Sequence, residues 1–246
     1  MEPELPLVGM ASERQRVGAA FDNREPLLIL GPRGCGKTRL IGETLRGRQE
    51  WLYIAWEPTL HALLVSISRA LIGTGHSDFL ARATPGAEPE GWLSRQTSIH
   101  LKGLLWNSLE SAPAPLVLDG ICGAGFPAYR FLRRIYHTTG MTIVAAARDT
   151  AGMGALNRLL WDPERMLRIA PLNVRDAADL FDSAADLLNL GNLSLNGFRE
   201  KVLECANGNP GQIIEKCRLA TQPQYLAGRH VKFAPLRIDA FIKSTG

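Results

Sequence analysis

Residues 31–38 read Gly31-Pro32-Arg33-Gly34-Cys35-Gly36-Lys37-Thr38 and fit the pattern G-x-x-x-x-G-K-[ST] at every position. The apolar run 27–30 before them predicts a short buried strand, and residues 39–45 after them predict a helix. A strand, such a loop and a helix in this order are typical of the Walker A phosphate loop, whose glycines let backbone N–H groups turn toward phosphate oxygens. The sequence therefore predicts a nucleoside triphosphate site, with ATP as the expected ligand.

Each part of this loop has an expected role. The helix N-terminus adds partial positive charge, the Lys37 ammonium would reach the β- and γ-phosphates, and the Thr38 hydroxyl would ligate Mg²⁺. A chance glycine-rich turn is the alternative, which the flanking strand and helix disfavour. The predicted nucleotide-binding residues of the loop are Gly31, Pro32, Arg33, Gly34, Cys35, Gly36, Lys37, Thr38 and Arg39.

The composition is that of an ordinary globular protein. The 246 residues are 46% hydrophobic and 21% charged, which suits one nucleotide-binding core and a small second domain. The 4 cysteines lack C-x-x-C spacing, so we expect neither a zinc site nor a disulfide framework, and we predict a cytoplasmic location. No signal peptide or apolar run of ~20 residues is evident, so we expect no membrane insertion. A net charge of +4 permits contact with nucleic acid.

Apolar runs alternate with helical patterns over residues 1–172. Further strands are predicted at 51–56, 115–118, 142–147 and 166–170, helices at 59–72 and 92–110, and a surface loop at 73–91. This alternation predicts the α/β fold of a P-loop NTPase, a parallel five-stranded sheet flanked by helices, with ligands beyond the carboxyl ends of its strands.

Strand signals stop after Leu172. Asn173 followed by Asp176 is typical of a helix cap, and amphipathic segments follow at 176–190, 198–206 and 212–220. We therefore predict a nucleotide-binding domain over residues 1–172, a small helical lid over 173–221 and a basic C-terminal tail over 222–246. The basic residues of the tail are Arg229, His230, Lys232, Arg237 and Lys243.

Two charged residues follow predicted strands. Asp119 ends the apolar run Leu116-Val117-Leu118, a Walker B pattern, and would hold Mg²⁺ through a water molecule; an Asp-Gly turn is the alternative. Arg148 ends the strand at 142–147, where a fixed guanidinium would stabilise charge on a transferring phosphate. An arginine that merely leaves the sheet into solvent is an equally good interpretation.

Together these motifs resemble the AAA+ superfamily of P-loop ATPases, above all the signal-transduction ATPases (the STAND class) and the archaeal origin-recognition ATPases. Residues 7–14, which include Val8 and Gly9, are similar to the N-terminal box that packs near adenine. Arg148 matches the sensor-one arginine of the STAND class. Gly208-Asn209-Pro210 looks like the glycine-proline motif of the lid, near the sugar and phosphates, which makes Pro210 a candidate nucleotide contact. The resemblance covers about residues 7–220 and leaves the tail unmatched.

Two departures from the superfamily pattern argue against efficient hydrolysis. Gly120 stands where many AAA+ enzymes carry a glutamate after the Walker B aspartate, and Gly211 and Gln212 stand near the place of the lid arginine. Glu57 follows the second strand, where RecA-type ATPases look similar and place their catalytic glutamate. It could orient the attacking water; a carboxylate that merely favours a helix start, beside Pro58, is the alternative.

The resemblance implies a magnesium-dependent ATPase that turns ATP into ADP and phosphate and drives assembly or conformational change on a protein or DNA partner, as a homo-oligomer in the ATP state. Arg158 and Arg165 are candidates for an arginine that completes a neighbouring site, whereas Arg133 and Arg134 could contact a partner or DNA. One alternative is a slow-turnover regulatory switch that holds ATP or ADP. Another is a DNA-binding loader or transposition-type regulator that uses the basic tail.

Overall fold

The computed structural model describes residues 5–83, 88–195 and 197–245, and these fall into two compact units. The larger unit comprises Glu13–Gly31 and Ile41–Arg168. The smaller unit combines the residues up to Ser12, Pro32–Leu40 and the chain from Ile169 onward. The phosphate-loop residues after Gly31 therefore group with the C-terminal helices. The predicted domain boundary at residues 172–173 stays a prediction.

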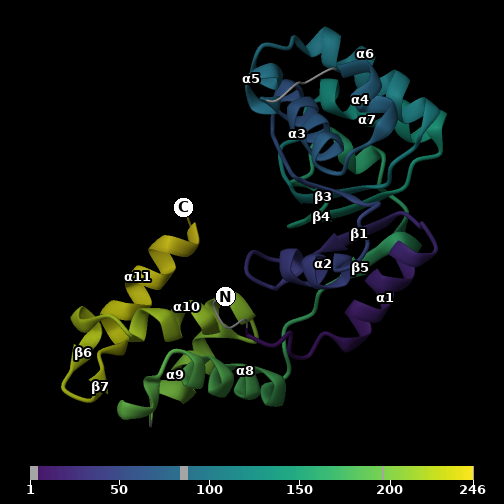
Figure 1. Cartoon of the computed structure of the whole chain (residues 1–246). Coiled ribbons are helices and arrows are strands. Elements are labelled where there is room, and N and C mark those ends of the chain that lie inside the picture. The colour runs from purple at the N-terminus through teal and green to yellow at the C-terminus, as the bar shows by residue number, and fades with distance from the viewer. Residues whose placement is uncertain (1–4, 84–87, 196, 246) are drawn as a thin grey trace. The chain divides into compact units, whose positions relative to one another are not determined.

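The larger unit is built on a parallel five-stranded sheet (Figure 1). Its strands are β1 (Leu27–Leu30), β2 (Leu52–Ala55), β3 (Leu116–Ile121), β4 (Ile143–Ala147) and β5 (Met166–Arg168), in the spatial order β2-β3-β4-β1-β5. Every residue of β1 and β4 is buried, as a sheet covered on both faces requires. The predicted α/β fold and its five parallel strands are confirmed.

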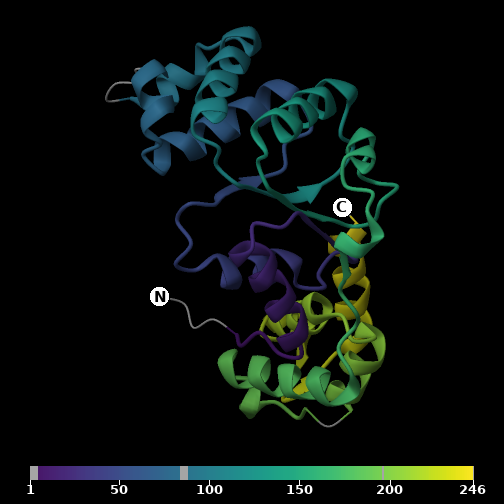
Figure 2. The same ribbon diagram turned by 90° about the vertical axis from the view of Figure 1, so that its right-hand side faces the viewer.

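Helices lie on both faces of this sheet (Figure 1, Figure 2). The core on one face contains buried residues of α3 (Leu60–Gly73), α4 (Ser77–Ala83), α5 (Pro89–Ser94), α6 (Ser98–Ser111) and α7 (Phe126–Thr139), and within it α4 and α5 pack on other helices. On β1, Leu28 and Leu30 point into that core, since side chains alternate along a strand. The opposite face carries α1 (Ala11–Asp22) and the part of α2 (Lys37–Leu45) that begins at Ile41.

The region between α3 and α6 differs from its prediction. A surface loop was expected at 73–91, but α4 and the start of α5 lie in this range. Helix α4 forms there because Phe79 and Ala83, one helical turn apart, are buried in the core. So short an apolar pattern is hard to detect in sequence. Residues 84–87 of that predicted loop lie outside the described residues. The single helix expected at 92–110 is divided between α5 and α6, since Thr97 caps α6 by accepting from His100 N at 3.2 Å.

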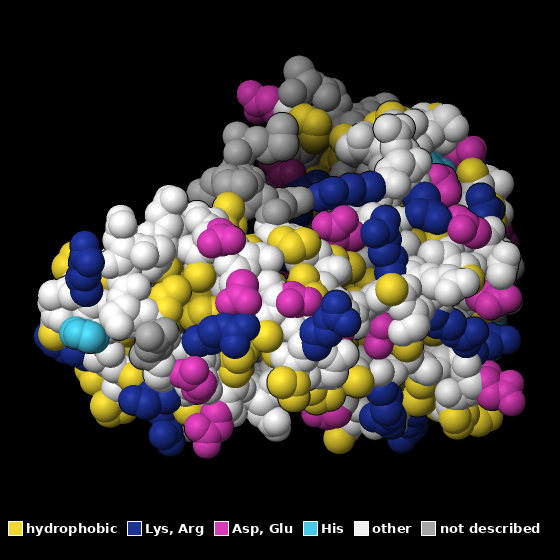
Figure 3. Space-filling model, turned by 90° about the horizontal axis from the view of Figure 1, so that it is seen from below, with side chains coloured by type: hydrophobic (Ala, Val, Ile, Leu, Met, Phe, Trp, Pro, Cys, Tyr) yellow, Lys and Arg dark blue, Asp and Glu magenta, His cyan; other side chains and the backbone are white. Residues whose placement is uncertain are grey.

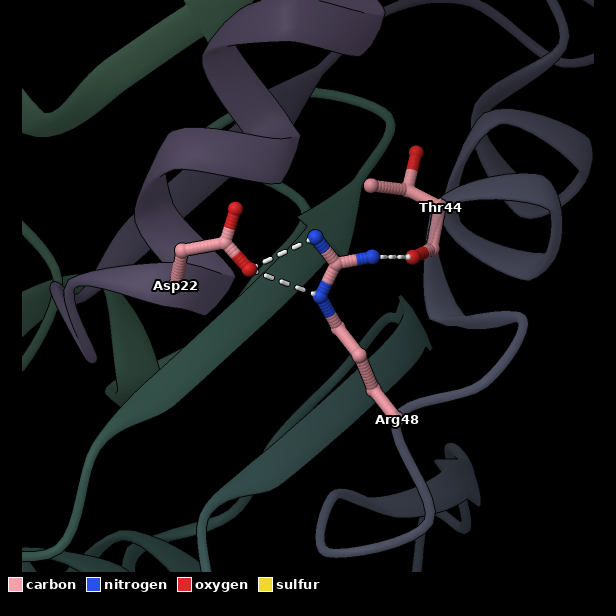
Figure 4. A network of polar contacts seen from close by, with 3 residues as sticks. All are labelled: Asp22, Thr44 and Arg48. Carbon is pink, nitrogen blue, oxygen red and sulfur yellow. Dashed lines mark hydrogen bonds and ion pairs between the residues drawn. The ribbon is translucent and has the colours of Figure 1, made fainter.

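An arginine links the ends of α1 and α2 within the larger unit (Figure 4). Arg48 donates from Nε and Nη2 to Asp22 Oδ1, at 3.0 and 2.6 Å, and from Nη1 to the Thr44 carbonyl. The Thr44 carbonyl belongs to the last turn of α2, where carbonyls have no partner inside the helix. Arg48 therefore caps α2 and fixes α1 beside it.

The smaller unit holds α8 (Val174–Leu187), α9 (Phe198–Ala206), α10 (Pro210–Ala220) and α11 (Phe233–Thr245), with a hairpin of β6 (Leu226–Ala227) and β7 (His230–Val231). The predicted cap of α8 is confirmed: Asn173 Oδ1 accepts from Asp176 N at 2.8 Å. The segment expected to be a basic tail forms the hairpin and α11, whose Leu236 is fully buried among the lid helices. The two short strands were not predicted, because two-residue strands leave no periodic signal in a sequence. The side chain of Lys243 lies outside the described part.

Four short 3-10 helices complete the described chain: η1 (Ala155–Arg158), η2 (Pro163–Arg165), η3 (Leu190–Asn192) and η4 (Pro223–Tyr225). Among the described residues, no helix combines the length and the apolar character needed to cross a membrane.

Candidate nucleotide site

The phosphate loop has the backbone that its glycines predict. Gly34 and Gly36 adopt φ angles of +81° and +99°, which side-chain-bearing residues rarely adopt. An added Cβ on Gly36 would lie 2.9 Å from Met10 Cε, so this position also lacks space. Within the described ranges, the N–H groups of Gly34 and Gly36 have no hydrogen-bond acceptor. Two main-chain donors of the loop are therefore left for an added acceptor, as phosphate binding requires.

The lysine of the motif lies over this loop. Lys37 Nζ donates to the Pro32 carbonyl at 3.0 Å and lies 3.7 Å from the buried Cys35 Sγ. Lys37 is the first residue of α2, so the ammonium adds to the positive end of the helix dipole. Thr38 beside it is exposed. An ammonium and a hydroxyl at a helix N-terminus fit a triphosphate with its cation.

The first turn of α10 packs directly against the phosphate loop, within the smaller unit. Gly211 N donates to the Gly34 carbonyl at 2.8 Å, and Asn209 Nδ2 donates to the Arg33 carbonyl at 2.9 Å. Asn209 Oδ1 also caps α10 by accepting from Gln212 N at 3.2 Å. Both contacts use loop carbonyls, so the N–H groups of Gly34 and Gly36 stay available. The lid helix is therefore hydrogen-bonded to the main chain of the loop itself.

This packing explains one departure from the superfamily pattern. A Cβ on Gly211 would lie 2.7 Å from Gly34 Cα and 2.9 Å from Gly34 O. Both are backbone atoms, which cannot move aside as a side chain can. Arginine, or any residue larger than glycine, is therefore excluded at Gly211 while α10 contacts the loop in this way.

The N-terminal box lies against the start of the lid. Gly9 has a φ of +68°, and an added Cβ would lie 2.6 Å from Asp176 Oδ2. Val8 packs on the lid core, and Leu172 N donates to the Gly208 carbonyl at 2.8 Å. The predicted nucleotide contacts Val8, Gly9 and Pro210 thus share a unit with the phosphate loop from Pro32 onward. Their contacts with nucleotide stay predictions.

In the larger unit, Asp119 is held by a tyrosine. Tyr53 Oη donates to Asp119 Oδ2 at 2.7 Å, and burial, reinforced by this bond, raises the pKa of Tyr53. Parallel pairing places Ala55 beside Asp119, so Tyr53, two residues earlier on the same face of β2, reaches the carboxylate past a methyl group. Sequence reasoning missed Tyr53; the only signal was its place on the alternating strand that precedes Glu57.

The other oxygen of Asp119 fits a metal's water shell. Asp119 is 7% exposed, and its Oδ1 is buried without a hydrogen-bond partner in the part of the chain that the structure describes. A buried carboxylate oxygen is costly to leave unpaired, and it suits a hard cation or the water bound to one. The predicted role of Asp119 toward Mg²⁺ is compatible with this environment.

The residue after Asp119 explains the second departure. The alternative interpretation of Asp119 and Gly120 as a turn is wrong, because β3 continues through both residues to Ile121. Gly120 has a φ of +80°, and the pairing of β3 with β4 shifts register between Leu118 and Ile121. Such a bulge favours glycine, so a glutamate at this position would be strained.

Glu57 lies two residues beyond β2, half-buried. Its charge, after that of Glu90, helps to raise the pKa of Arg69 on α3. The described residues give the Glu57 carboxylate no hydrogen-bond donor. Backbone pairing continues from β2 toward this point, since Trp56 N donates to the Asp119 carbonyl at 2.8 Å. Glu57 and Asp119 therefore emerge from adjacent strands at the carboxyl edge of the sheet.

Arg148 follows β4, the strand between β3 and β1. Its neighbour Ala147 pairs with Leu30, and the Ala147 carbonyl accepts from Gly31 N at 3.3 Å. Arg148 is exposed at the edge where the phosphate loop begins. Of the two arginines considered for a neighbouring site, Arg165 pairs with Asp162 at 3.3 Å and Arg158 lies over a phenylalanine ring.

This chain is similar to known proteins in structure but matches none of them in sequence. No protein-family model and no curated protein sequence matches the chain. A structure of katanin from work on its self-assembly matches with 12% identity and a TM-score of 0.51, covering 98% of this chain and 82% of that one. A point mutant of Thermotoga maritima RuvB matches with 14% identity and a TM-score of 0.55, covering 100% and 73%.

A third match is a STAND protein with a tetratricopeptide repeat sensor from Pyrococcus horikoshii. It has 15% identity and a TM-score of 0.50, covering 98% of this chain and 33% of that chain. All three matches are AAA+ ATPases, and identities this low establish the fold and not the activity. These likenesses show that this chain has the fold of these AAA+ ATPases, which is the fold that its motifs predict.

Proposed function

We propose that this chain binds Mg²⁺-ATP and hydrolyses it to ADP and phosphate, and that the nucleotide changes the contact between the phosphate loop and α10. The observation that carries the proposal is the loop itself. Left-handed glycines at 34 and 36 keep two N–H groups available, and Lys37 starts the next helix. Such a loop on this fold favours a triphosphate over other anions.

Each candidate residue has a separate proposed task. Lys37 binds the β- and γ-phosphates, Thr38 ligates Mg²⁺, and Asp119 holds a water of its shell through Oδ1. Bound Mg²⁺ would neutralise phosphate charge during the reaction. Arg148 stabilises charge on the transferring phosphate, and Glu57 orients the attacking water. The proposed role of Glu57 rests on its position two residues beyond β2.

Phosphate release from Mg²⁺-ATP tests the proposal. Lys37→Ala should abolish turnover and nucleotide binding, whereas Lys201→Ala, which removes an exposed ammonium from α9, should leave both intact. Glu57→Gln should abolish turnover and spare binding. Equal turnover in the Lys37→Ala variant and the unmodified chain would refute the phosphate-loop proposal. Unchanged turnover in Glu57→Gln would refute only the role of Glu57.

A second candidate function is a regulatory switch that holds nucleotide and turns over rarely. Gly120 favours it, because the φ of +80° leaves no unstrained place for the usual glutamate. If the chain is such a switch, nucleotide should survive purification and appear by chromatography of the denatured protein. Rapid steady-state turnover would count against it.

We also propose that ATP promotes self-association. The katanin structure that this fold resembles was studied for self-assembly, a property of that protein. Light scattering with ATP, ADP or no nucleotide tests this for the present chain. An unchanged molecular mass in all three states would contradict it.

A further inference from the structure

Helix α7 has a basic face opposite its buried face. Ala128, Phe131, Leu132 and Ile135 face the core at helical spacing. Phe126, Arg130, Arg133, Arg134 and His137 are all exposed and recur with the same spacing on the other side. These five residues are called the α7 stripe. The helix contains no aspartate or glutamate.

The arginines of the stripe are not neutralised by carboxylates. In the described chain, Arg130, Arg133 and Arg134 take part in no ion pair. The elements that pack on α7 are α3, α6 and η1, and their only acidic residue is Glu110, at the exposed end of α6. The positive charge of the α7 arginines is therefore not balanced by acidic residues on α7 itself and meets only Glu110 on α3, α6 and η1.

Aromatic rings hold two guanidinium groups at this surface. Arg134 Cζ lies 3.9 Å from the centre of the Trp106 ring, and Arg158 Cζ lies 5.2 Å from the centre of the Phe126 ring. A guanidinium stacked on a ring loses less freedom on binding, because its position is already restricted. Arg158 extends the row of cations beyond the first turn of α7.

Other surfaces of the chain are more balanced. On the face drawn in Figure 3, Lys and Arg side chains are interspersed with Asp and Glu. Several exposed arginines elsewhere have carboxylate partners, such as Arg69 with Glu90 and Arg199 with Asp182. The arginines of α7 therefore differ from these paired arginines in having no carboxylate partner among the described residues.

We propose that the α7 stripe binds the phosphate backbone of duplex DNA without reading its sequence. Successive turns of α7 are ~5.4 Å apart, and each strand of a duplex carries one phosphate every ~3.4 Å of its axis, so phosphates are dense enough for each turn to meet one. A duplex suits this surface better than a single strand, because single strands stack bases on open rings, and guanidinium groups already lie over Trp106 and Phe126.

Fluorescence anisotropy with a labelled duplex of mixed sequence tests the proposal. If three phosphates are contacted, log K should fall with log[salt] with a slope of about −2.7, a loss of about 40-fold between 50 and 200 mM salt. The triple variant Arg130→Gln, Arg133→Gln, Arg134→Gln should weaken binding about tenfold or more and flatten this slope. Replacing the same three residues by lysine should retain most of the affinity, because phosphate contacts require charge more than shape.

A matched control changes the same number of charges elsewhere: Arg229→Gln, Lys232→Gln, Arg237→Gln in the hairpin and α11, all exposed. It should bind DNA normally. Circular dichroism should show that all variants are folded. Loss of binding in the control but not in the α7 variant would overturn the proposal, as would salt-independent binding or a preference for polyglutamate over DNA. Lys37→Ala should keep DNA binding, since the stripe does not depend on the phosphate loop.

Discussion

Gly211→Ala is the most direct test of the contact between the lid helix and the phosphate loop. The new Cβ would lie 2.7 Å from Gly34 Cα, whereas ordinary contacts begin at 3.4 Å, so the two segments must separate by about 0.7 Å (3.4 − 2.7). That movement stretches the bonds Gly211 N to Gly34 O and Asn209 Nδ2 to Arg33 O, now 2.8 and 2.9 Å, to about 3.5 Å or more. Both bonds would be lost.

Two hydrogen bonds contribute about 1–3 kcal/mol together, and alanine in a helix recovers up to about 1 kcal/mol. Taking about 2 kcal/mol for the two bonds, the contact should weaken by about 1–2 kcal/mol, which corresponds to an equilibrium constant for local opening that is about 5–30-fold larger. Hydrogen exchange of the amides at 208–213 measures this opening directly. Asn209→Asp is a second variant: it keeps the capping oxygen for Gln212 N but replaces the donor to Arg33 with a carboxylate.

Gly103→Ala is the matched control, because Gly103 lies inside α6 and an added Cβ would meet nothing within 4 Å. This change should stabilise the chain by about 0.5–1 kcal/mol. If Gly211→Ala leaves exchange at 208–213 unchanged, or protects these amides as Gly103→Ala protects α6, the inferred contact between α10 and the loop is wrong.

Three further predictions concern the larger unit and the lid core. Tyr53→Phe removes the donor that holds Asp119 and should weaken Mn²⁺ binding to the ATP complex about tenfold, as measured by electron paramagnetic resonance; an unchanged affinity would contradict the role of Tyr53. Burial raises the pKa of Cys217 from 9.0 to about 12, so the folded state retains this proton longer than the unfolded state. The resulting stability is complete below pH 9 and is lost as the pH rises toward 12, and urea unfolding should show a smaller alkaline loss in Cys217→Ala. Arg48→Gln removes the ion pair with the largely exposed Asp22 and should lower stability by about 0.5–1 kcal/mol in thermal unfolding, whereas equal stability would show that the pair is dispensable.

The sequence predicted the elements whose signals are local. The strand β1, the phosphate loop and α2 follow from adjacent apolar and glycine positions, and the cap of α8 follows from Asn173 and Asp176, three residues apart. Contacts between distant segments were not predictable in this way. Tyr53 and Asp119 are 66 residues apart, and their hydrogen bond depends on the register of β2 against β3.

The same reasoning applies to the C-terminal segment. Its basic residues lie among apolar ones and fit either a solvated or a docked segment, and in the structure Tyr225 and Leu236 are buried and attach the hairpin and α11 to the lid helices. Spaced apolar residues in a charged segment are a weak sequence signal, yet each fully buried side chain contributes about 1.5–3 kcal/mol. Packing of these side chains therefore decides between the two interpretations, which the charge pattern left open.

Gly120 and Gly211 show that the two departures from the superfamily pattern have structural causes. At Gly120 the bulge of β3 requires a left-handed backbone, and at Gly211 the close contact with Gly34 excludes a Cβ. Restoring the usual side chains would therefore disturb the backbone at both places before any catalytic group was supplied. In this chain the lid contacts the main chain of the phosphate loop, so a change in loop conformation on nucleotide binding can reach α10 without an arginine. Under the proposed function, that arrangement would couple lid position to nucleotide binding even where hydrolysis is slow.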